Sequence, residues 1–339
     1  MNKKFHNLII LSFIFFSCAS NKTEKYPEWI TQPYKNYDDN YFVTVGNDKE
    51  KNVADLKAVE DLAGIFGMNV QSTTLAETIM TKSEQEQVSN IIEEQNFNQQ
   101  ILVNVDQRNL IGIEIVERYF DKKNEQWYSL AVLDKKKAAQ IYSKEIEACY
   151  KKISENYSVS RRTVDTFSRL GYLYQCKKDT QYVQSLLQRL QVIDFKTLEK
   201  IKNPDITENR FSIEFNKLAN TVPISIDIND DYNDEIINAC ITVLETYGFK
   251  INQDSDNILK VMIEKFFRDV SNPDAVYCEA TLSIYLNTDE GRVLFPFNYS
   301  GRAAGRENDI ALKKEYAILN DIIQTEYKNV IEDMLLQIK

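Results

Sequence analysis

The N-terminal stretch constrains this chain most, because it decides in which compartment the rest of the chain folds. Lys3 and Lys4 form a positively charged start, residues 5–16 are an apolar run rich in Leu, Ile and Phe, and the small Ser17 precedes Cys18. A basic start, a short apolar stretch and a small residue at the cleavage site are typical of a secretory signal. About twelve apolar residues are too few to cross ~30 Å of hydrocarbon as a helix, so we expect no permanent transmembrane anchor here.

Cys18 stands directly at the predicted cleavage site. The stretch therefore resembles a bacterial lipoprotein signal, in which the cysteine is lipidated and becomes the new N-terminus; a signal that is simply cleaved off is the alternative. On the lipoprotein interpretation, residues 1–17 are the signal and residues 18–25 are a polar tether. Ala19 and Ser20 lack the aspartate that resembles an inner-membrane retention signal. We therefore predict a lipid-anchored protein of the bacterial cell envelope, held by Cys18, with the outer membrane favoured.

Charge and histidine content exclude several classes of function. The formal charge of −10 becomes −12 once the signal is removed, because the signal holds two lysines and no acids. Such an acidic chain is a poor ligand for nucleic acid or anionic lipid, so the lipid on Cys18 would supply the membrane affinity. The single histidine, His6, lies inside the signal. A mature chain without histidine has no Ser-His or Cys-His catalysis, and we predict no catalytic residue, metal or cofactor.

Four cysteines remain besides Cys18, and none belongs to a CxxC pair or a metal-ligand spacing. Cys149 and Cys176 fall on two consecutive predicted helices. If these helices form an antiparallel hairpin, the two residues are offset by about 12 Å along it, beyond the ~7 Å Cα limit for a disulfide. Cys240 and Cys278 both face the predicted core, so they form either a disulfide or two buried thiols.

Hydrophobic patterns predict an α+β module in the first half of the chain. Its elements follow in the order strand 41–46, helix 52–66, strand 70–80, exposed helix or loop 82–100, hairpin 110–133 and helix 134–157. Asp134 is the expected N-cap of the last helix. Two further helical stretches are predicted at 161–177 and 179–193.

The second half carries clearer patterns. Its elements are strand 222–228, helix 233–247, strand 258–267, hairpin 275–300 with Pro296 on an edge strand, and helix 307–337. Both halves then have the order β-α-β-β-β-α, which predicts an α+β fold of two modules with one architecture and mainly antiparallel sheets, joined by a helical stretch. The predicted boundaries are signal 1–17, tether 18–25, first domain 26–157, helical stretch 158–193, linker 194–210 and C-terminal domain 211–339.

Residues 27–155 resemble a known family. The opening Pro27-Glu28-Trp29, the strand 42–46 that ends in Gly46, the helix with Ala54, Ala58 and Ala63, and the 110–133 hairpin are similar to the Lpp-twenty family of bacterial lipoproteins. That family shares a small α+β domain with the N-terminal part of the flagellar assembly protein T. The resemblance implies an envelope lipoprotein facing the periplasm or the cell surface, and it supplies no catalytic residues. The C-terminal module is not covered by it.

Two stretches have the residue types of ligand sites, each with a simpler structural interpretation. Asp227 to Asp231 place oxygens at alternating positions, as a calcium loop begins, but Tyr232 and Asn238 stand where that loop needs Gly and Glu. A capped acidic helix N-terminus is the alternative. Gly301 to Arg306 precede a predicted helix and could bind an anion through backbone N–H groups, or they form a plain strand-to-helix turn.

Basic and aromatic residues mark candidate contact surfaces. Arg161 and Arg162 flank a predicted helix turn, as a site for an acidic partner or as a solvated helix end. Trp29 and Trp127 either belong to a recognition surface or pack on the first sheet. Both questions depend on contacts between distant parts of the chain.

We expect a non-catalytic binding or scaffold component of envelope or flagellar assembly, which contacts an unidentified envelope protein and no nucleic acid. The candidate contact residues are Trp127, Tyr128, Arg161 and Arg162. A periplasmic or surface ligand carrier and an adhesin are the alternatives. A hydrolase that uses two carboxylates, such as Asp254 and Asp256, is a further alternative, because paired acids need no histidine.

Overall fold

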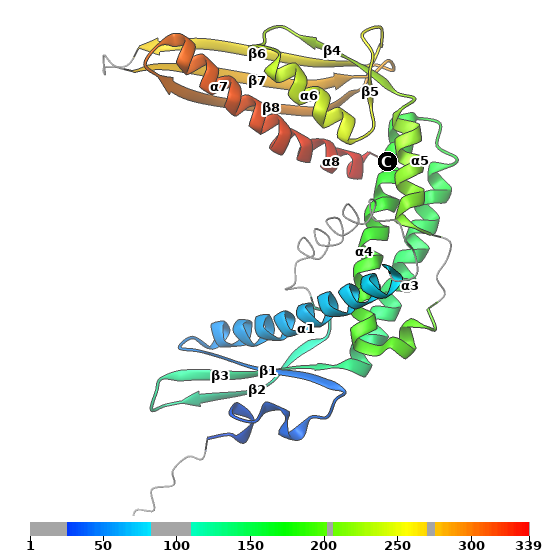
Figure 1. Cartoon of the computed structure of the whole chain (residues 1–339), viewed down its shortest axis with the longest axis vertical. Helices are drawn as coiled ribbons and strands as arrows, with labels where there is room; N and C mark the ends of the chain where they lie inside the picture. Colours follow the sequence, from blue (N-terminus) through cyan, green and yellow to red (C-terminus); the bar gives the residue numbers. More distant parts are fainter. Residues whose placement is uncertain (1–25, 83–109, 202–205, 270–274, 339) are drawn as a thin grey trace, which may run out of the picture. The chain divides into compact units, whose positions relative to one another are not determined.

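The computed structural model describes residues 26–82, 110–201, 206–269 and 275–338 (Figure 1). These residues form two compact units. The first contains residues 26–63 and 113–133, and the second contains residues 64–82, 110–112 and 134–338. Within the described ranges, no helix is long and apolar enough to cross a membrane.

The first unit is a small sheet with helices on both faces. Its strands are β1 (Tyr41–Asp48), β2 (Ile113–Asp121) and β3 (Gln126–Asp134), in the order β1-β3-β2. Helix α1 (Lys51–Lys82) lies on one face, and the short helices η1 (Glu28–Ile30) and η2 (Pro33–Asn36) lie on the other (Figure 1). The core beneath η1 is formed by Trp29, Val43, Leu130 and Val132.

Helix α1 lies very close to β1, and small residues make this possible. A Cβ atom on Gly46 would lie 2.2 Å from the backbone nitrogen of Ala58 and 2.4 Å from the carbonyl oxygen of Ala54. Both alanines are fully buried, and the Thr44 hydroxyl donates a 2.6 Å hydrogen bond to the Ala58 carbonyl. The glycine on the strand and the spaced alanines on the helix therefore form one packing contact, since larger side chains would separate the two backbones.

The prediction of a strand at residues 70–80 is wrong, because α1 continues without interruption from Lys51 to Lys82. Gly67 lies inside this helix, where glycine is tolerated at a cost of about 1 kcal/mol. Threonine-rich segments favour strands only where a pleated surface is available for packing. Apart from Lys82, the ambiguous stretch 82–100 lies outside the described residues.

Ahead of its sheet, the second unit contains the long helices α3 (Lys135–Ser160) and α4 (Thr166–Leu198) and the shorter helix α5 (Glu208–Ala219). Asp134 caps α3 as predicted, since its carboxylate accepts hydrogen bonds from the backbone N–H groups of Lys136 and Lys137. The stretches predicted at 161–177 and 179–193 are one helix, α4, in which Asp194 interrupts the helical backbone.

A five-stranded mixed sheet follows, in the order β5-β4-β6-β7-β8. Its strands are β4 (Pro223–Ile228), β5 (Lys250–Ile251), β6 (Ile258–Asp269), β7 (Val276–Asn287) and β8 (Val293–Gly305). Strand β4 is parallel to β5 and β6, whereas β6, β7 and β8 pair antiparallel. The alternation predicted for β7 is confirmed, and β8 is the edge strand that Pro296 indicated.

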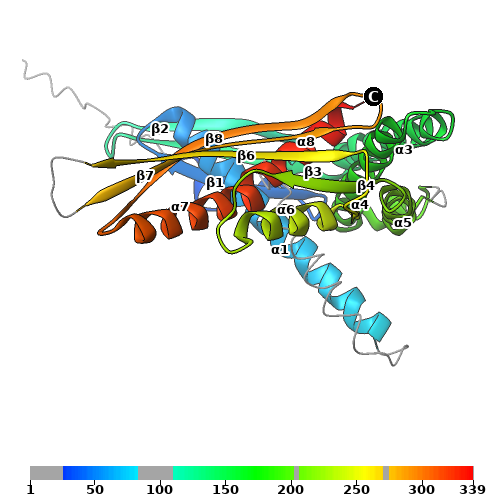
Figure 2. The same ribbon diagram turned by 90° about the horizontal axis from the view of Figure 1, so that it is seen from above.

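Helices cover one face of this sheet. They are α6 (Glu235–Thr246) and α7 (Asn308–Ile322), and a π-helical turn, η3 (Ile323–Tyr327), joins α7 to α8 (Lys328–Gln337) (Figure 2). The predicted α+β class with mainly antiparallel pairing is confirmed. The strand order differs between the two sheets, so the expected common architecture is not found: the second sheet has parallel strands around β4, which the first lacks among the described residues.

Helix α4 packs directly on the sheet module. A Cβ atom on Gly171 would lie 2.3 Å from the carbonyl oxygen of Ile338, so α4 and the end of α8 touch backbone to backbone. Lys178 on α4 also forms a 2.5 Å ion pair with Glu332 on α8. Helices α3, α4 and α5 and the five-stranded sheet are thus parts of one unit. The described residues of the predicted linker 194–210 belong to the same unit.

Replacing Gly46 by alanine tests the contact between β1 and α1. The new methyl group would collide with helix backbone rather than with a flexible side chain, so we expect Gly46→Ala to lower the free energy of unfolding by about 3 kcal/mol. Gly64→Ala is the matched control on α1, because no atom lies within 4 Å of its added methyl group. It should raise the free energy of unfolding by about 1 kcal/mol. Urea unfolding measures both, and a Gly46→Ala protein as stable as the wild type would contradict the packing argument.

Candidate functional site

The end of the β2–β3 hairpin carries four aromatic residues that we call the hairpin surface: Tyr26, Phe120, Trp127 and Tyr128. Phe120 pairs with Trp127 across the two strands, and their ring centroids are 4.9 Å apart. Tyr128 lies on the opposite face, because side chains alternate along a strand, and the Tyr26 ring meets it edge-on at 5.8 Å. The hairpin surface thus consists of two aromatic pairs, one on each face of the hairpin.

Asp121 holds this end of the hairpin in one conformation. Its carboxylate accepts hydrogen bonds from the Tyr26 hydroxyl, from the Lys123 backbone N–H at 2.9 Å and from the Asn124 side-chain amide at 2.6 Å. The hydrogen bond from Tyr26 is the main reason why the pKa of Asp121 lies below its usual value. Sequence reasoning identified the turn but missed this role, although aspartate and asparagine in a turn are the usual signal for it.

The two tryptophans have different surroundings. Trp29 is 8% exposed and belongs to the core beneath η1, so its packing on the first sheet is confirmed. Trp127 is half-buried, with the Lys51 ammonium 5.8 Å from the ring centroid and Phe120 against it. Cation–π and aromatic contacts therefore position Trp127 while part of its ring stays accessible.

Asp55 on α1 fastens the helix to both strands of the hairpin. The Arg118 guanidinium of β2 donates to its two oxygens at 2.9 Å and 3.1 Å, and the Ser129 hydroxyl of β3 donates at 2.6 Å. Partial burial alone would raise the pKa of Asp55, but these hydrogen bonds together outweigh burial and hold the pKa below its usual value. The network keeps the strand residues next to the hairpin surface in place.

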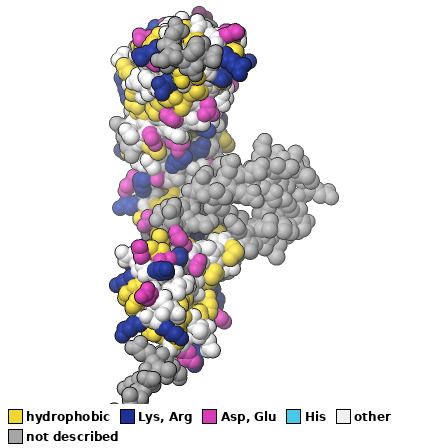
Figure 3. Space-filling view, turned by 90° about the vertical axis from the view of Figure 1, so that its left-hand side faces the viewer, with side chains coloured by type: hydrophobic (Ala, Val, Ile, Leu, Met, Phe, Trp, Pro, Cys, Tyr) yellow, Lys and Arg dark blue, Asp and Glu magenta, His cyan; other side chains and the backbone are white. Residues whose placement is uncertain are grey.

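Arg161 and Arg162 belong to the second unit, at the end of α3, and both are exposed. The Arg162 guanidinium donates a 3.2 Å hydrogen bond to the Ser158 carbonyl, a usual arrangement at a helix C-terminus. The four predicted contact residues are thus divided between the two units, with Trp127 and Tyr128 in the first and Arg161 and Arg162 in the second. On the face shown in Figure 3, basic and acidic side chains are interspersed rather than gathered by sign.

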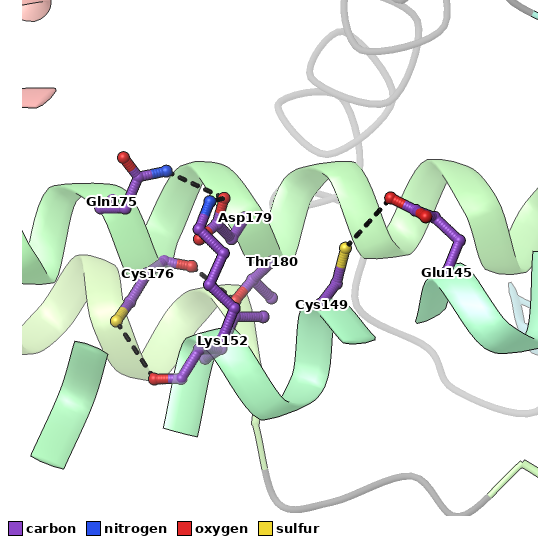
Figure 4. A network of polar contacts seen from close by, with 8 residues as sticks. Glu145, Cys149, Lys152, Gln175, Cys176, Asp179 and Thr180 are labelled. Atoms are coloured by element: carbon purple, nitrogen blue, oxygen red, sulfur yellow. Dashed lines mark hydrogen bonds and ion pairs between the residues drawn. The ribbon is translucent and has the colours of Figure 1, made fainter. Parts of the chain in front are cut away.

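A polar network between α3 and α4 was missed by sequence reasoning (Figure 4). Lys152 on α3 forms a 2.9 Å ion pair with Asp179 on α4, and the Gln175 side chain donates to the same oxygen at 2.9 Å. The second Asp179 oxygen is buried and has no hydrogen-bond partner within the described residues. Hydrophobic periodicity cannot reveal such a pair, because it marks only the apolar face of a helix.

Cys149 and Cys176 flank this network as free thiols (Figure 4). The Cys176 sulfur lies 3.6 Å from the carbonyl oxygen of Ile153, so Cys176 is level with a residue one helical turn from Cys149. The predicted register of the two helices is therefore wrong, and the offset along the hairpin is about 6 Å rather than about 12 Å. The hairpin is centred on residues 161–165, later in the chain than predicted.

The acidic stretch after β4 has structural contacts along its length. Asp231 caps α6 by accepting hydrogen bonds from two backbone N–H groups, at 3.0 Å and 2.9 Å. The Asn229 side chain exchanges two hydrogen bonds with the backbone of β6, and Asp227 and Asp230 pair with lysines on that strand. These contacts match the capped helix N-terminus. In the part of the chain that the structure describes, no three histidine, cysteine or acidic side chains are grouped to hold a metal ion.

Gly301 and Gly305 lie inside β8, so the predicted strand-to-helix turn with its anion site is wrong. A Cβ atom on Gly305 would lie 2.4 Å from the backbone nitrogen of Ala311, which shows that glycine here lets α7 approach the strand. Asp254 and Asp256 are exposed in the turn between β5 and β6. Their surroundings are those of turn residues.

Thiol reactivity tests the assignment of four free cysteines, which include the buried Cys240 and Cys278. Burial raises the pKa of Cys149 to about 11 and those of Cys176 and Cys240 to about 12, and the thiolate is the reactive form. At pH 8, we expect the half-buried Cys149 of the folded protein to react with a maleimide about 100-fold more slowly than an ordinary cysteine. The three buried thiols should react more slowly still. Mass mapping that finds a disulfide between any two of the four would contradict the assignment.

Comparisons with known proteins find a family match for the first part of the chain. Residues 27–134 match the family described as LPP20 lipoprotein. The crystal structure of the secreted protein HP1454 from Helicobacter pylori is 14% identical over 86% of this chain and 98% of that chain, with a TM-score of 0.44. A minor lipoprotein from Acinetobacter baumannii is 11% identical over 34% of this chain and 92% of that chain, with a TM-score of 0.25. Neither score reaches 0.5, so neither likeness bears on the fold. No curated protein matches.

The matched residues contain the features on which the resemblance depends. Trp29 lies in the core, Gly46 lies against Ala54 and Ala58, and the β2–β3 hairpin completes the sheet. The match of residues 27–134 to the LPP20 lipoprotein family, the Lpp-twenty family that the sequence resembles, indicates a cell-envelope lipoprotein.

Proposed function

We propose that the protein is a lipid-anchored, non-catalytic binding or scaffold component of the bacterial envelope, held in the outer membrane by Cys18. Its main contact with an envelope protein partner is the hairpin surface. The family match of residues 27–134 supports the envelope location, and three of the four hairpin-surface residues, all but Tyr26, lie within this matched segment. Cys18 itself lies outside the described residues.

The arrangement of the hairpin surface carries this proposal. Tyrosine and tryptophan are enriched among the residues that dominate protein interfaces. Tyr26 stays 39% exposed although its hydroxyl is fixed by Asp121, and Trp127 is half-buried beneath the Lys51 ammonium. Rings that are already held in place lose little conformational freedom on binding, so a partner would meet a preorganised surface.

Strand β2 adds a second feature beside the hairpin surface. Among the described residues it has one neighbouring strand, β3, and a β-bulge at Val116 leaves that side chain 43% exposed. Exposed strand edges accept an extended segment of a partner chain through backbone hydrogen bonds. Contact through aromatic rings and a strand edge needs no reactive side chain, which suits a role in envelope or flagellar assembly.

Substitution of the hairpin surface tests the partner contact. The full-length protein with Trp127→Ala and Tyr26→Ala should recover at least 10-fold less of its crosslinked partner from membranes, since two interface aromatics typically contribute more than 1 kcal/mol each. The control is Arg161→Ala with Arg162→Ala, which alters the other predicted contact residues. Quantitative mass spectrometry of the crosslinked material, with circular dichroism to confirm folding, measures both. A larger loss from the arginine pair would move the contact to the second unit.

Substitution of Cys18 tests the anchor. Cys18→Ser should move most of the protein from the membrane fraction to the soluble fraction after a high-salt wash, because the acidic chain has little other affinity for anionic lipid. Immunoblots of the two fractions measure the distribution. A variant that remains on the membrane after the wash would contradict anchoring by lipid alone.

A further inference from the structure

Glu315 is a fully buried carboxyl group without a hydrogen-bond partner. It lies on α7, its side chain is 0% exposed, and neither of its oxygens is paired within the described residues. Transfer of an ionised carboxylate from water into such a site is very unfavourable, whereas the neutral acid costs far less. The buried position therefore favours a protonated Glu315.

Strand β8 leaves space for this carboxyl group at a glycine. A Cβ atom on Gly301 would lie 3.0 Å from the Glu315 Oε1 and 2.7 Å from the Tyr299 hydroxyl. Gly301, Ala303 and Gly305 alternate along the side of β8 that α7 covers, and these small residues let the helix lie close to the strand. Glu315 is thus enclosed between α7 and the sheet.

The neighbouring groups on β7, β8 and α6 do not stabilise a negative charge. Cys278 on β7 and Tyr299 on β8 are titratable groups that face Glu315, and the pKa of each is raised, mainly by burial and next by a charged Glu315. Cys240 on α6 instead faces Tyr327. Both groups that face Glu315 are neutral in their ordinary state, so neither supplies a compensating cation.

A lysine near Cys278 takes part in another set of contacts. Lys265 on β6 forms a 2.6 Å ion pair with Asp230 and lies over the Tyr316 ring, with its ammonium 5.4 Å from the centroid. Glu326 on η3 acts on Tyr299 with the same sign as Glu315. Burial raises the pKa of Glu315 to about 7.

The C-terminal helical segment consists of α7, which carries Glu315, the turn η3 and α8, and α7 and α8 are anchored differently. Helix α8 is held by Gly171, by the ion pair from Lys178 and by the Tyr247 hydroxyl, which donates a 2.9 Å hydrogen bond to the Lys328 carbonyl. Helix α7 lies on β7 and β8. The π-helical turn η3 separates the halves, and such turns often occur at functional sites within helices.

We propose that Glu315 is a proton-dependent latch: when protonated it lets α7 lie on β8, and when ionised it drives α7 away from the sheet about η3, while α8 stays in place. The direction follows from proton linkage. A docked α7 binds the Glu315 proton more tightly than an open α7, where the carboxyl is solvated. The stability of docking is therefore fully present at acidic pH and is lost as the pH rises through about 7.

Hydrogen exchange of the full-length protein at pH 5.5 and pH 8.0 tests the latch. After correction for the intrinsic pH dependence of exchange, the protection factors of amides 308–322 should fall by about 30-fold at the higher pH, while those of 328–337 change little. Glu315→Gln should remove the difference between the two pH values. Asp321→Asn, which removes an exposed carboxylate from the same helix, should behave like the wild type.

Three results would overturn the latch. Equal loss of protection in α7 and α8 would show a general change in stability, and no pH-dependent loss in either would show that the charge is accommodated. The same pH dependence in Glu315→Gln would assign it to another group. If Glu315→Gln does not fold, Glu315→Met offers a side chain of similar length without a titratable group, and it should likewise show no pH-dependent loss in α7.

Discussion

Within each of the two units, helices and strands are held together by close backbone contacts that only glycine permits. A Cβ atom would lie 2.2 Å from backbone at Gly46, 2.3 Å at Gly171 and 2.4 Å at Gly305. In each case the element packed against the glycine would have to move away to admit one methyl group, because packed interiors do not absorb such a volume locally. The position of α1 at Gly46 also brings Asp55 to Arg118 and Lys51 to Trp127, so the hairpin surface depends on this contact.

Two carboxyl groups of the second unit, Asp179 and Glu315, differ in whether a cation lies beside them. Asp179 lies against the Lys152 ammonium, so the ion pair offsets part of its desolvation. Neither oxygen of Glu315 has a partner within the described residues, and Lys265 of the same unit is paired with Asp230. The first arrangement joins two helices through an ion pair, whereas the second makes the contact of a helix with the sheet depend on one proton. The presence of a neighbouring lysine thus distinguishes the structural ion pair of Asp179 from the proposed switch at Glu315.

Local sequence signals predicted the elements whose surroundings are simple. The alternation along β7, the cap at Asp134 and the edge position indicated by Pro296 are all found. Each signal is set by neighbours along the chain: a strand with one buried face, a helix start, or a missing backbone donor. Errors arose where packing overrides such signals. Residues 70–80 continue a helix despite their threonines, and Gly301 serves close packing in a strand rather than a turn.

By itself the sequence predicted a secretory signal that ends before Cys18. It determined that the single histidine lies in that predicted signal, and it determined the α+β class and the family resemblance of the first part of the chain. Only the tertiary structure decided which tryptophan is buried, which acids are paired, and that Glu315 is enclosed opposite Gly301. The physical reason is the difference in sequence separation between the interactions that set each property. Periodicity and capping reflect interactions over a few residues, whereas burial and the energy of a charge depend on atoms from elements far apart in the chain, whose distances no local pattern records.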